Sequence, residues 1–208
     1  MQNSTKAQEP SQIQIFGAVL PDLMIECVLD NDHPHQLRFE KWDGGKAARV
    51  STTRYRGHTY APAPIASGLA QTVRFPVASK PFESAPKLCA SMLGFLCRYS
   101  RLLPDAAALI IAFATASWFA DCLPVAPVLY LLGPDNDARL VLRLLGCLCR
   151  RPILLGDIDL AALATLPNHL DATLLVDQRN LARRVARVFP AVMRCRGVPD
   201  PPTRRASR

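Results

Sequence analysis

The sequence lacks the cysteine and histidine spacings that bind metal ions. It has seven cysteines and four histidines, but no two cysteines form a Cys-x-x-Cys pair and the histidines are not spaced with them as ligands. The odd number of cysteines, in mostly apolar segments, also disfavours a secreted disulfide framework. We therefore expect no metal site, small buried cysteines and a reducing, cytoplasmic environment.

Long apolar runs are also missing. Residues 1–11 are polar, so we expect a flexible leader rather than a signal segment. The best membrane candidate is the uncharged run 106–120, between Asp105 and Asp121. As a helix it reaches about 22 Å, whereas the hydrocarbon core of a bilayer is about 30 Å thick. The run predicts a buried helix, apolar all round, and membrane insertion is not expected.

Acidic residues are almost absent from the last thirty residues, 179–208, which hold nine arginines and one aspartate. Residues 1–178 are balanced, so the net charge of +8 lies in this end of the chain. Residues 199–208 are expected to be a disordered basic tail. A helix near 179–189 would place four arginines on one face, where they could contact the phosphates of a nucleic acid; they are Arg179, Arg183, Arg184 and Arg187. A solvated helix face is the alternative interpretation, because no base-reading motif accompanies these arginines.

Residues 12–82 predict a β-rich part that ends in a proline-rich linker. Apolar-rich runs at 13–16 and 24–29, and alternation at 37–42, indicate strands. The sequence Asp-Gly-Gly-Lys at 43–46 predicts a turn, with 49–55 as the returning strand. The prolines of 61–82 predict an extended linker.

Helices and strands alternate in residues 83–198. Helical spacing predicts a connector of two helices, at 84–99 and 105–120, and further helices at 137–149, near 158–165 and near 179–189. Strands are expected at 128–132, 153–155 and 173–177. The fold class is therefore predicted as α/β: a β-rich amino-terminal part, a helical connector, and a parallel sheet with flanking helices.

The parallel part has the layout of a P-loop nucleotide site. A working P-loop reads Gly-x-x-x-x-Gly-Lys-Ser/Thr, and an acid follows a later strand. The strand 128–132 ends at Gly133, which fits the first glycine, and Asp177 fits the acid. Ala138 falls on the second glycine, Arg139 on the lysine, and Leu140 on the hydroxyl that binds Mg²⁺. We therefore expect a partial P-loop-like domain with a degraded phosphate site.

Each departure from the P-loop pattern weakens phosphate binding. Ala138 adds a methyl group where close approach is needed, and Leu140 cannot coordinate a metal ion. Asp135 and Asp137 place two carboxylates in the loop. At about 5 Å and an effective dielectric constant near 20, each would repel a phosphate charge by roughly 3 kcal/mol. Gln178 stands where ATPases carry a catalytic glutamate, and glutamine is a poor general base.

Residues 105–178 resemble a P-loop ATPase family, of the AAA+ type, found in primase–helicase-like proteins of mobile elements and phages. The resemblance lies in Ala116-Ser117-Trp118-Phe119, in 124–134, in 142–146, in Arg151-Pro152 and in 173–177. It implies ATP-driven work on DNA for intact relatives. The chain resembles a shortened member, because only about thirty residues follow 177, whereas such ATPases need further strands that carry a polar sensor and an arginine finger. Val192, Met193 and Cys195 could supply one more strand.

The expected function is that of a non-catalytic P-loop homologue, a binding or remnant protein that needs no cofactor. Its expected partners are nucleic acid, through the carboxy-terminal arginines, or a partner ATPase. The alternative is an active ATPase or helicase-like protein with an atypical loop, which uses ATP and Mg²⁺. In that case Arg139 contacts phosphate and Asp177 holds Mg²⁺ through water.

Overall fold

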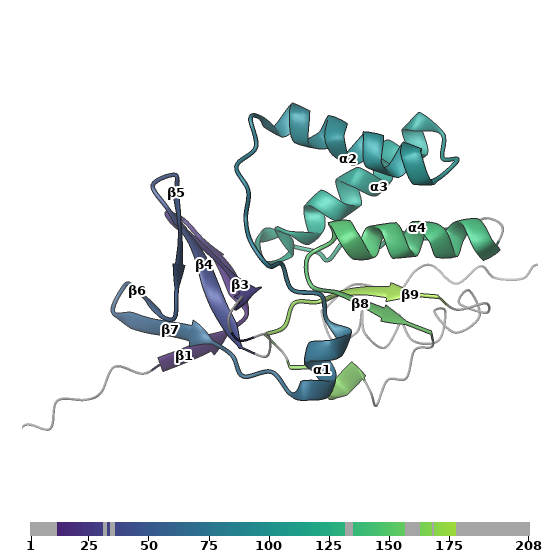
Figure 1. The fold of residues 1–208 in the computed structure, drawn as a ribbon. Helices are drawn as coiled ribbons and strands as arrows, with labels where there is room; N and C mark the ends of the chain where they lie inside the picture. Colours follow the sequence, from purple (N-terminus) through teal and green to yellow (C-terminus); the bar gives the residue numbers. More distant parts are fainter. Residues whose placement is uncertain are drawn as a thin grey trace, which may run out of the picture.

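The computed structural model describes residues 12–30, 33, 36–131, 135–156, 163–167 and 169–177. In this part of the chain a β-rich amino-terminal half lies beside a layer of helices and a small parallel sheet (Figure 1). The elements in chain order are β1 (Gln12–Ile15), β2 (Gly17–Leu20), β3 (Leu23–Leu29), β4 (Leu37–Asp43), β5 (Lys46–Val50), β6 (Thr53–Tyr55), β7 (His58–Pro62), α1 (Ser67–Thr72), α2 (Ala85–Tyr99), α3 (Pro104–Ser117), the 3-10 turn η1 (Ala120–Cys122), α4 (Asp135–Leu148), β8 (Pro152–Leu155) and β9 (Thr173–Val176).

The β-rich half consists of two sheets. Strands β2, β3, β4 and β5 form an antiparallel meander, while β7 pairs with β6 antiparallel and with β1 parallel. The turn expected at 43–46 is confirmed: Asp43 pairs with Lys46, and Gly44 and Gly45 have φ of 57° and 84°. Both positive angles suit a two-residue hairpin turn, which glycine adopts without steric cost.

The prediction that 61–82 is only an extended linker is wrong. Strand β7 runs to Pro62, helix α1 lies within the segment, and Val73 and Phe75 are buried. Phe75 stacks on Phe16 in the core of the β-rich half, with ring centroids 5.9 Å apart. Burying these apolar side chains stabilises the packed segment, at roughly 25 cal/mol for each Å² removed from water. The prolines therefore shape this segment without keeping it away from the core.

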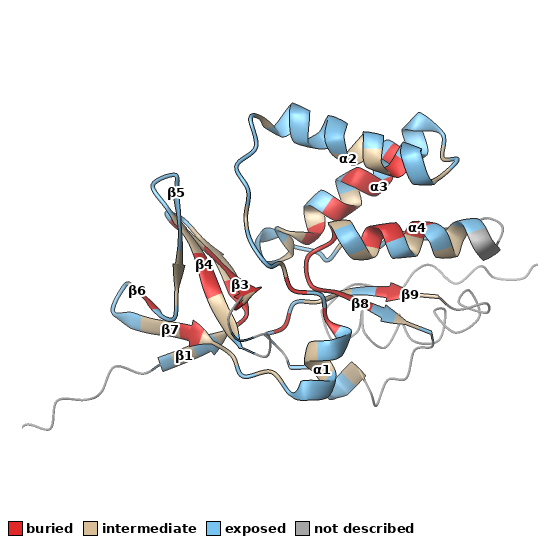
Figure 2. Cartoon of the chain, in the orientation of Figure 1, coloured by how far each residue is buried: buried red, intermediate tan, exposed pale blue. Residues whose placement is uncertain are grey.

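The two connector helices are confirmed, at α2 and α3. The Ser84 side chain caps α2 by accepting the Lys87 backbone N–H at 3.4 Å. Helix α3 is not buried all round as expected: Ile110 and Ile111 are buried, whereas Leu109 is 61% exposed. In Figure 2, burial on α2, α3 and α4 lies mainly where these helices face one another. The apolar outer surface of α3 explains why its sequence shows no amphipathic pattern.

The mixed α/β class is confirmed, but the sheets are mostly antiparallel. Within the described residues, parallel pairing is confined to β1–β7 and to the two strands β8 and β9. Helix α4 lies along the β8–β9 pair (Figure 1), and Leu175 of β9 packs close to Gly146 of α4. Ile153 of β8 belongs instead to the core of the β-rich half. The small parallel sheet thus contributes to both hydrophobic cores.

Candidate functional site

Arg139 and Asp177 meet at the end of the parallel sheet. Arg139 lies in the second turn of α4, and Asp177 directly follows β9. Arg139 Nε donates to Asp177 Oδ2 at 2.6 Å, although the two residues are 38 positions apart. The backbone N–H of Asp177 donates to the Leu155 carbonyl at 2.8 Å, which fixes the carboxylate at the end of the ladder. The two residues that the sequence pattern assigns to phosphate and Mg²⁺ therefore bind each other.

Water reaches this ion pair. The Arg139 side chain is 41% exposed and that of Asp177 is 30% exposed. A partly exposed pair of this kind contributes roughly 0–1 kcal/mol to stability. The pair neutralises both groups at little energetic gain, and a ligand with stronger contacts could separate them.

The other residues of the expected phosphate site are only partly described. Ala138 lies half-buried in α4, and Leu140 is partly exposed at the position where a hydroxyl would bind Mg²⁺. Asp137 is exposed at the start of the helix. Gly133 and Gln178 lie outside the described residues, as do all four arginines of the expected nucleic-acid helix: Arg179, Arg183, Arg184 and Arg187.

The strand expected at 128–132 is not formed over 128–131, and residue 132 lies outside the described part. Val128 and Tyr130 are 53% and 51% exposed, while Leu129 and Leu131 pack against the helical core. Exposed and packed side chains thus alternate along 128–131 as they do in a strand, but the segment forms no ladder of backbone hydrogen bonds. Pro124 and Pro127 each remove a backbone donor just before it, which disfavours pairing with a neighbouring strand.

A buried ion cluster joins the β-rich half to the end of α4, and sequence reasoning missed it. Glu26 of β3 is buried together with Arg150 and Arg151, which lie between α4 and β8. Glu26 Oε1 accepts Arg151 Nε at 2.7 Å, and Oε2 accepts Arg150 Nε and Arg151 Nη2, each at 2.8 Å. One carboxylate thus receives two guanidinium groups from adjacent residues.

Further groups complete this cluster. Arg150 Nη1 donates to Asp121 Oδ1 at 3.2 Å, so that two carboxylates balance two guanidiniums. Arg151 Nη1 donates to the Leu170 carbonyl at 2.6 Å. Burial alone would lower the pKa of Arg150, but attraction and hydrogen bonding to Glu26 outweigh it and raise that pKa. The signal that could have revealed the cluster is an acid inside an apolar strand and an arginine pair after an apolar helix.

Gly17 makes room for the cluster. A Cβ atom at this position would lie 2.3 Å from Arg151 Nη2 and 2.8 Å from the Ile25 carbonyl oxygen. Both distances are shorter than real Cβ contacts, and one of the atoms belongs to the backbone. The glycine is therefore required by packing against Arg151, and the cluster acts as a structural joint between the two halves.

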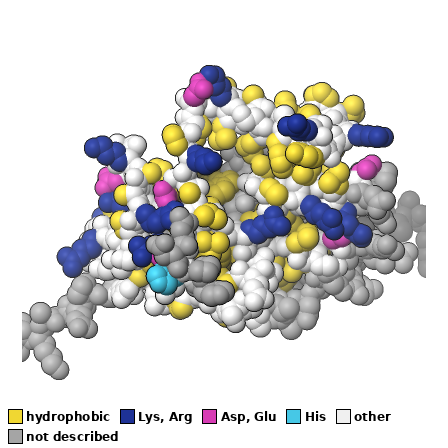
Figure 3. Space-filling model, in the orientation of Figure 1, with side chains coloured by type: hydrophobic (Ala, Val, Ile, Leu, Met, Phe, Trp, Pro, Cys, Tyr) yellow, Lys and Arg dark blue, Asp and Glu magenta, His cyan; other side chains and the backbone are white. Residues whose placement is uncertain are grey.

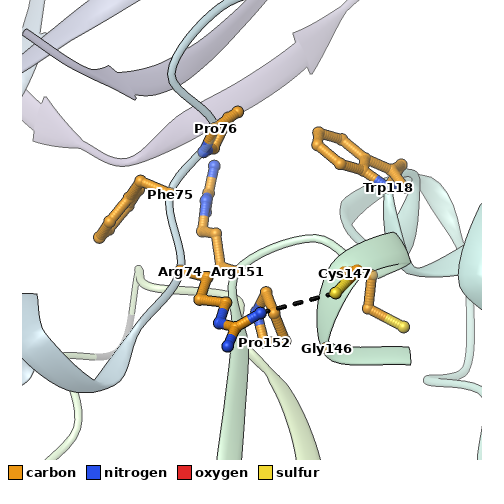
Figure 4. Close-up of a pocket in the computed structure, with 9 residues that line it drawn as sticks. Arg74, Phe75, Pro76, Trp118, Gly146, Cys147, Arg151 and Pro152 are labelled. Atoms are coloured by element: carbon orange, nitrogen blue, oxygen red, sulfur yellow. Dashed lines mark hydrogen bonds between the residues drawn. The ribbon is translucent and has the colours of Figure 1, made fainter. Parts of the chain in front are cut away.

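A separate cavity of about 290 Å³ lies beside this joint. Its walls include Arg74, Phe75, Trp118 and Pro152, and the Arg74 guanidinium points toward the Cys147 thiol at the end of α4 (Figure 4). Arg74 Nη1 lies 3.6 Å from Cys147 Sγ. The cavity has a mostly apolar surface with two arginines, Arg74 and Arg151, and it does not include Arg139 or Asp177.

The cysteines are less buried than expected. Of the six in the described part, Cys27 and Cys149 are buried, whereas four are exposed: Cys89, Cys97, Cys122 and Cys147. Burial raises the pKa of Cys27 to about 12 and that of Cys149 to about 11. Exposed thiols on α2 reflect the outer surface of that helix, which packs on one side only.

The described residues also bear on the expectations for a metal site and a membrane span. No group of three His, Cys, Asp or Glu side chains with metal-binding geometry occurs within residues 12–177 where these are described. In the same part of the chain, every helix is too short or too polar to cross a bilayer. Comparison with known proteins adds no relative: no family model, curated protein or solved structure matches the chain.

Proposed function

We propose that the protein is a non-catalytic relative of P-loop ATPases, which acts by binding a partner and does not use ATP. The observation that carries the proposal is the ion pair between Arg139 and Asp177. In a P-loop enzyme the cation at the position of Arg139 holds phosphate, and the acid at the position of Asp177 holds Mg²⁺. In this protein the Arg139 guanidinium and the Asp177 carboxylate pair with each other.

Charge supports the proposal further. Asp137 at the start of α4 and Asp177 at the end of β9 bring two carboxylates to this site, against one guanidinium from Arg139. The resulting net charge of −1 repels a triphosphate, by roughly 3 kcal/mol for each carboxylate at about 5 Å. The amino terminus of a helix offers an anion about 0.3–2 kcal/mol. Repulsion therefore exceeds attraction unless Mg²⁺ compensates, and Leu140 gives Mg²⁺ no hydroxyl ligand.

An active ATPase with an altered phosphate loop is the second candidate function. It is favoured by the fact that α4 and β9 bring Arg139 and Asp177 to one place, as a P-loop frame would. Because their ion pair is partly exposed, Mg·ATP would lose only roughly 0–1 kcal/mol by separating them. In that case Arg139 would contact phosphate, and Asp177 would hold Mg²⁺ through water.

Titration with a fluorescent ATP analogue and Mg²⁺ separates the two candidates. We expect no saturable binding up to about 1 mM, which corresponds to a binding free energy weaker than about 4 kcal/mol. Arg139→Ala should behave as the parent chain does, and Arg143→Ala, one turn further along α4, is the matched control. Micromolar binding that is lost only in Arg139→Ala would establish the second candidate.

A rebuilt loop tests whether a P-loop frame exists at all. The triple variant Ala138→Gly, Arg139→Lys and Leu140→Thr restores the residue types that hold phosphate and Mg²⁺. We expect it to gain Mg-dependent ATP binding that the parent lacks. If the rebuilt chain folds as the parent does and still fails to bind, the relation to P-loop ATPases is wrong.

A further inference from the structure

Residues 44–82 contain six basic residues and no acidic residue. This stretch follows Asp43 and precedes Glu83, and it includes β5, β6 and β7. Figure 3 shows Lys and Arg side chains on the side of the molecule that carries these strands and also over the helices. The basic residues of this stretch lie in different places: Arg74 lines the cavity beside Cys147, whereas Arg54 and Arg56 lie at the β6–β7 hairpin.

Two arginines of the β6–β7 hairpin, Arg54 and Arg56, have no carboxylate partner among the described residues. Arg49 approaches Glu40 at 3.6 Å and donates to the Val77 carbonyl. Arg54 of β6 and Arg56 of the β6–β7 turn are exposed, and neither forms an ion pair within the described part of the chain. Their charges are therefore free to bind an external anion.

The backbone holds Arg56 in a conformation that favours glycine. Tyr55 pairs with His58, and between them Arg56 and Gly57 have φ of 46° and 82°. The β4–β5 hairpin has positive φ at both central positions too, and there both are glycine. Asparagine or glycine is usual at the position of Arg56, and other residues are disfavoured in this region. The Arg56 guanidinium lies over the Tyr55 ring, 5.2 Å from its centroid.

The adjoining sheet face carries hydrogen-bonding side chains. Gln12, Thr59 and Arg54 are in register across β1, β7 and β6, so their side chains share one face of the sheet. A hollow of about 290 Å³ is lined by Arg54, Arg56 and Thr59, among others. It combines two guanidiniums with a hydroxyl, which is a donor set suited to a phosphodiester.

We propose that this hairpin surface, defined by Gln12, Arg54, Arg56 and Thr59, binds single-stranded nucleic acid. The proposal deepens the binding role proposed above by naming its partner and its surface. Arg54 and Arg56 hold phosphates, while the amide of Gln12 and the hydroxyl of Thr59 face base edges that are accessible in a single strand. The guanidinium stacked on Tyr55 offers a flat cation on which a base can stack.

The acids near this surface are already engaged. Asp22 accepts the Tyr55 hydroxyl at 2.5 Å, and Asp43 pairs with Lys41 at 2.9 Å. The Tyr55 contact also fixes the ring beneath Arg56. Asp22 keeps its negative charge, because a hydroxyl does not neutralise a carboxylate, but the two guanidiniums of Arg54 and Arg56 outnumber it, so a polyanion is the complementary ligand.

Fluorescence anisotropy with labelled oligo(dT) and oligo(U) of about 12 nucleotides tests the proposal. In the full-length chain, Arg54→Gln with Arg56→Gln should weaken binding about tenfold at about 50 mM salt. It should also reduce the slope of log affinity against log salt by about 1.4, the value for two phosphate contacts on a single strand. Arg98→Gln with Arg101→Gln removes two exposed charges elsewhere and should change affinity less than about twofold. Comparing the two oligonucleotides distinguishes DNA from RNA as the preferred strand.

Arg56→Asn separates binding from folding. It creates Asn-Gly at the turn, which suits the positive φ of both central residues. We expect a melting temperature equal to or above that of the parent, together with weaker oligonucleotide binding. Lower stability with unchanged binding would show that Arg56 serves the turn alone and would overturn its assigned role.

Three other results would overturn the proposal. One is equal loss of binding in both double-arginine variants. The second is affinity for a duplex, or for phosphatidylserine vesicles, equal to that for the single strands. The third is loss of binding in Arg183→Gln with Arg184→Gln but not in the hairpin variant. None of these measurements involves ATP. The oligonucleotide experiment can therefore fail while the ATP titration gives the expected result, and the reverse.

Discussion

Glu26 is the residue on which the joint between the two halves depends. Its carboxylate is buried and binds two buried guanidiniums, from Arg150 and Arg151. A buried ion cluster adds little net stability compared with an apolar replacement of the whole group, because all the charges lose water. Removing a single partner is different, since the remaining charges stay buried without compensation.

We therefore expect Glu26→Gln to lower the free energy of unfolding by about 3–5 kcal/mol. Glu83→Gln is the matched control, because Glu83 pairs with Lys87 at an exposed site and should contribute less than about 1 kcal/mol. Urea unfolding followed by circular dichroism measures both. A loss in Glu26→Gln no larger than in the control would show that the cluster does not hold the halves together.

Cys27 gives a second prediction at this scale, in the alkaline range. Its pKa is raised from 9.0 to about 12 by burial, so the folded chain keeps a proton that the unfolded chain loses. Stability is then complete below pH 9 and falls as pH rises toward 12, by up to about 1.4 kcal/mol per pH unit. Cys27→Ala should flatten this slope, whereas Cys89→Ala, at an exposed thiol, should not. An unchanged slope in Cys27→Ala would contradict the assignment.

At the scale of elements, the sequence predicted the turns and helices whose formation depends on neighbouring residues. The Asp-Gly-Gly-Lys turn and the helix at 84–99 follow from preferences within a few residues, and both are present. Patterns that need a distant partner were less informative. Apolar residues at 128–131 predicted a strand, but pairing depends on a neighbour that the sequence does not name. Glu26 and Arg150 lie 124 positions apart, so each is locally unusual for its segment but no local pattern pairs one with the other.

Segment 128–131 can be tested directly by hydrogen exchange. Without a ladder, its amides should exchange at least about 100-fold faster than those of β9, which are held by pairing with β8. Mass spectrometry of peptic fragments gives both rates in one experiment. Comparable protection of the two segments would mean that 128–131 is a third strand of the sheet, as the sequence pattern predicted.

The pairing of Arg139 with Asp177 shows what a pattern of elements can and cannot predict. Placing one residue early in a helix and the other after a strand predicts that both face the same end of the sheet. The pattern did not predict that they would bind each other at 2.6 Å. That outcome depends on side-chain lengths and rotamers, which the pattern of elements does not specify.

At the scale of the whole molecule, the small parallel sheet links two cores. Ile153 packs with the β-rich half and Leu175 with the helices, while Glu26 bonds across the same boundary. The hairpin surface and the Arg139–Asp177 pair lie on different elements of this body. A binding role for the first therefore needs no nucleotide at the second.

A crystal structure of the protein grown with Mg²⁺ and a non-hydrolysable ATP analogue tests the central claim most directly. The account predicts that Arg139 Nε still contacts Asp177 and that no triphosphate lies at the start of α4. A triphosphate seated between these two side chains, with Mg²⁺ on the Asp177 side, would contradict it.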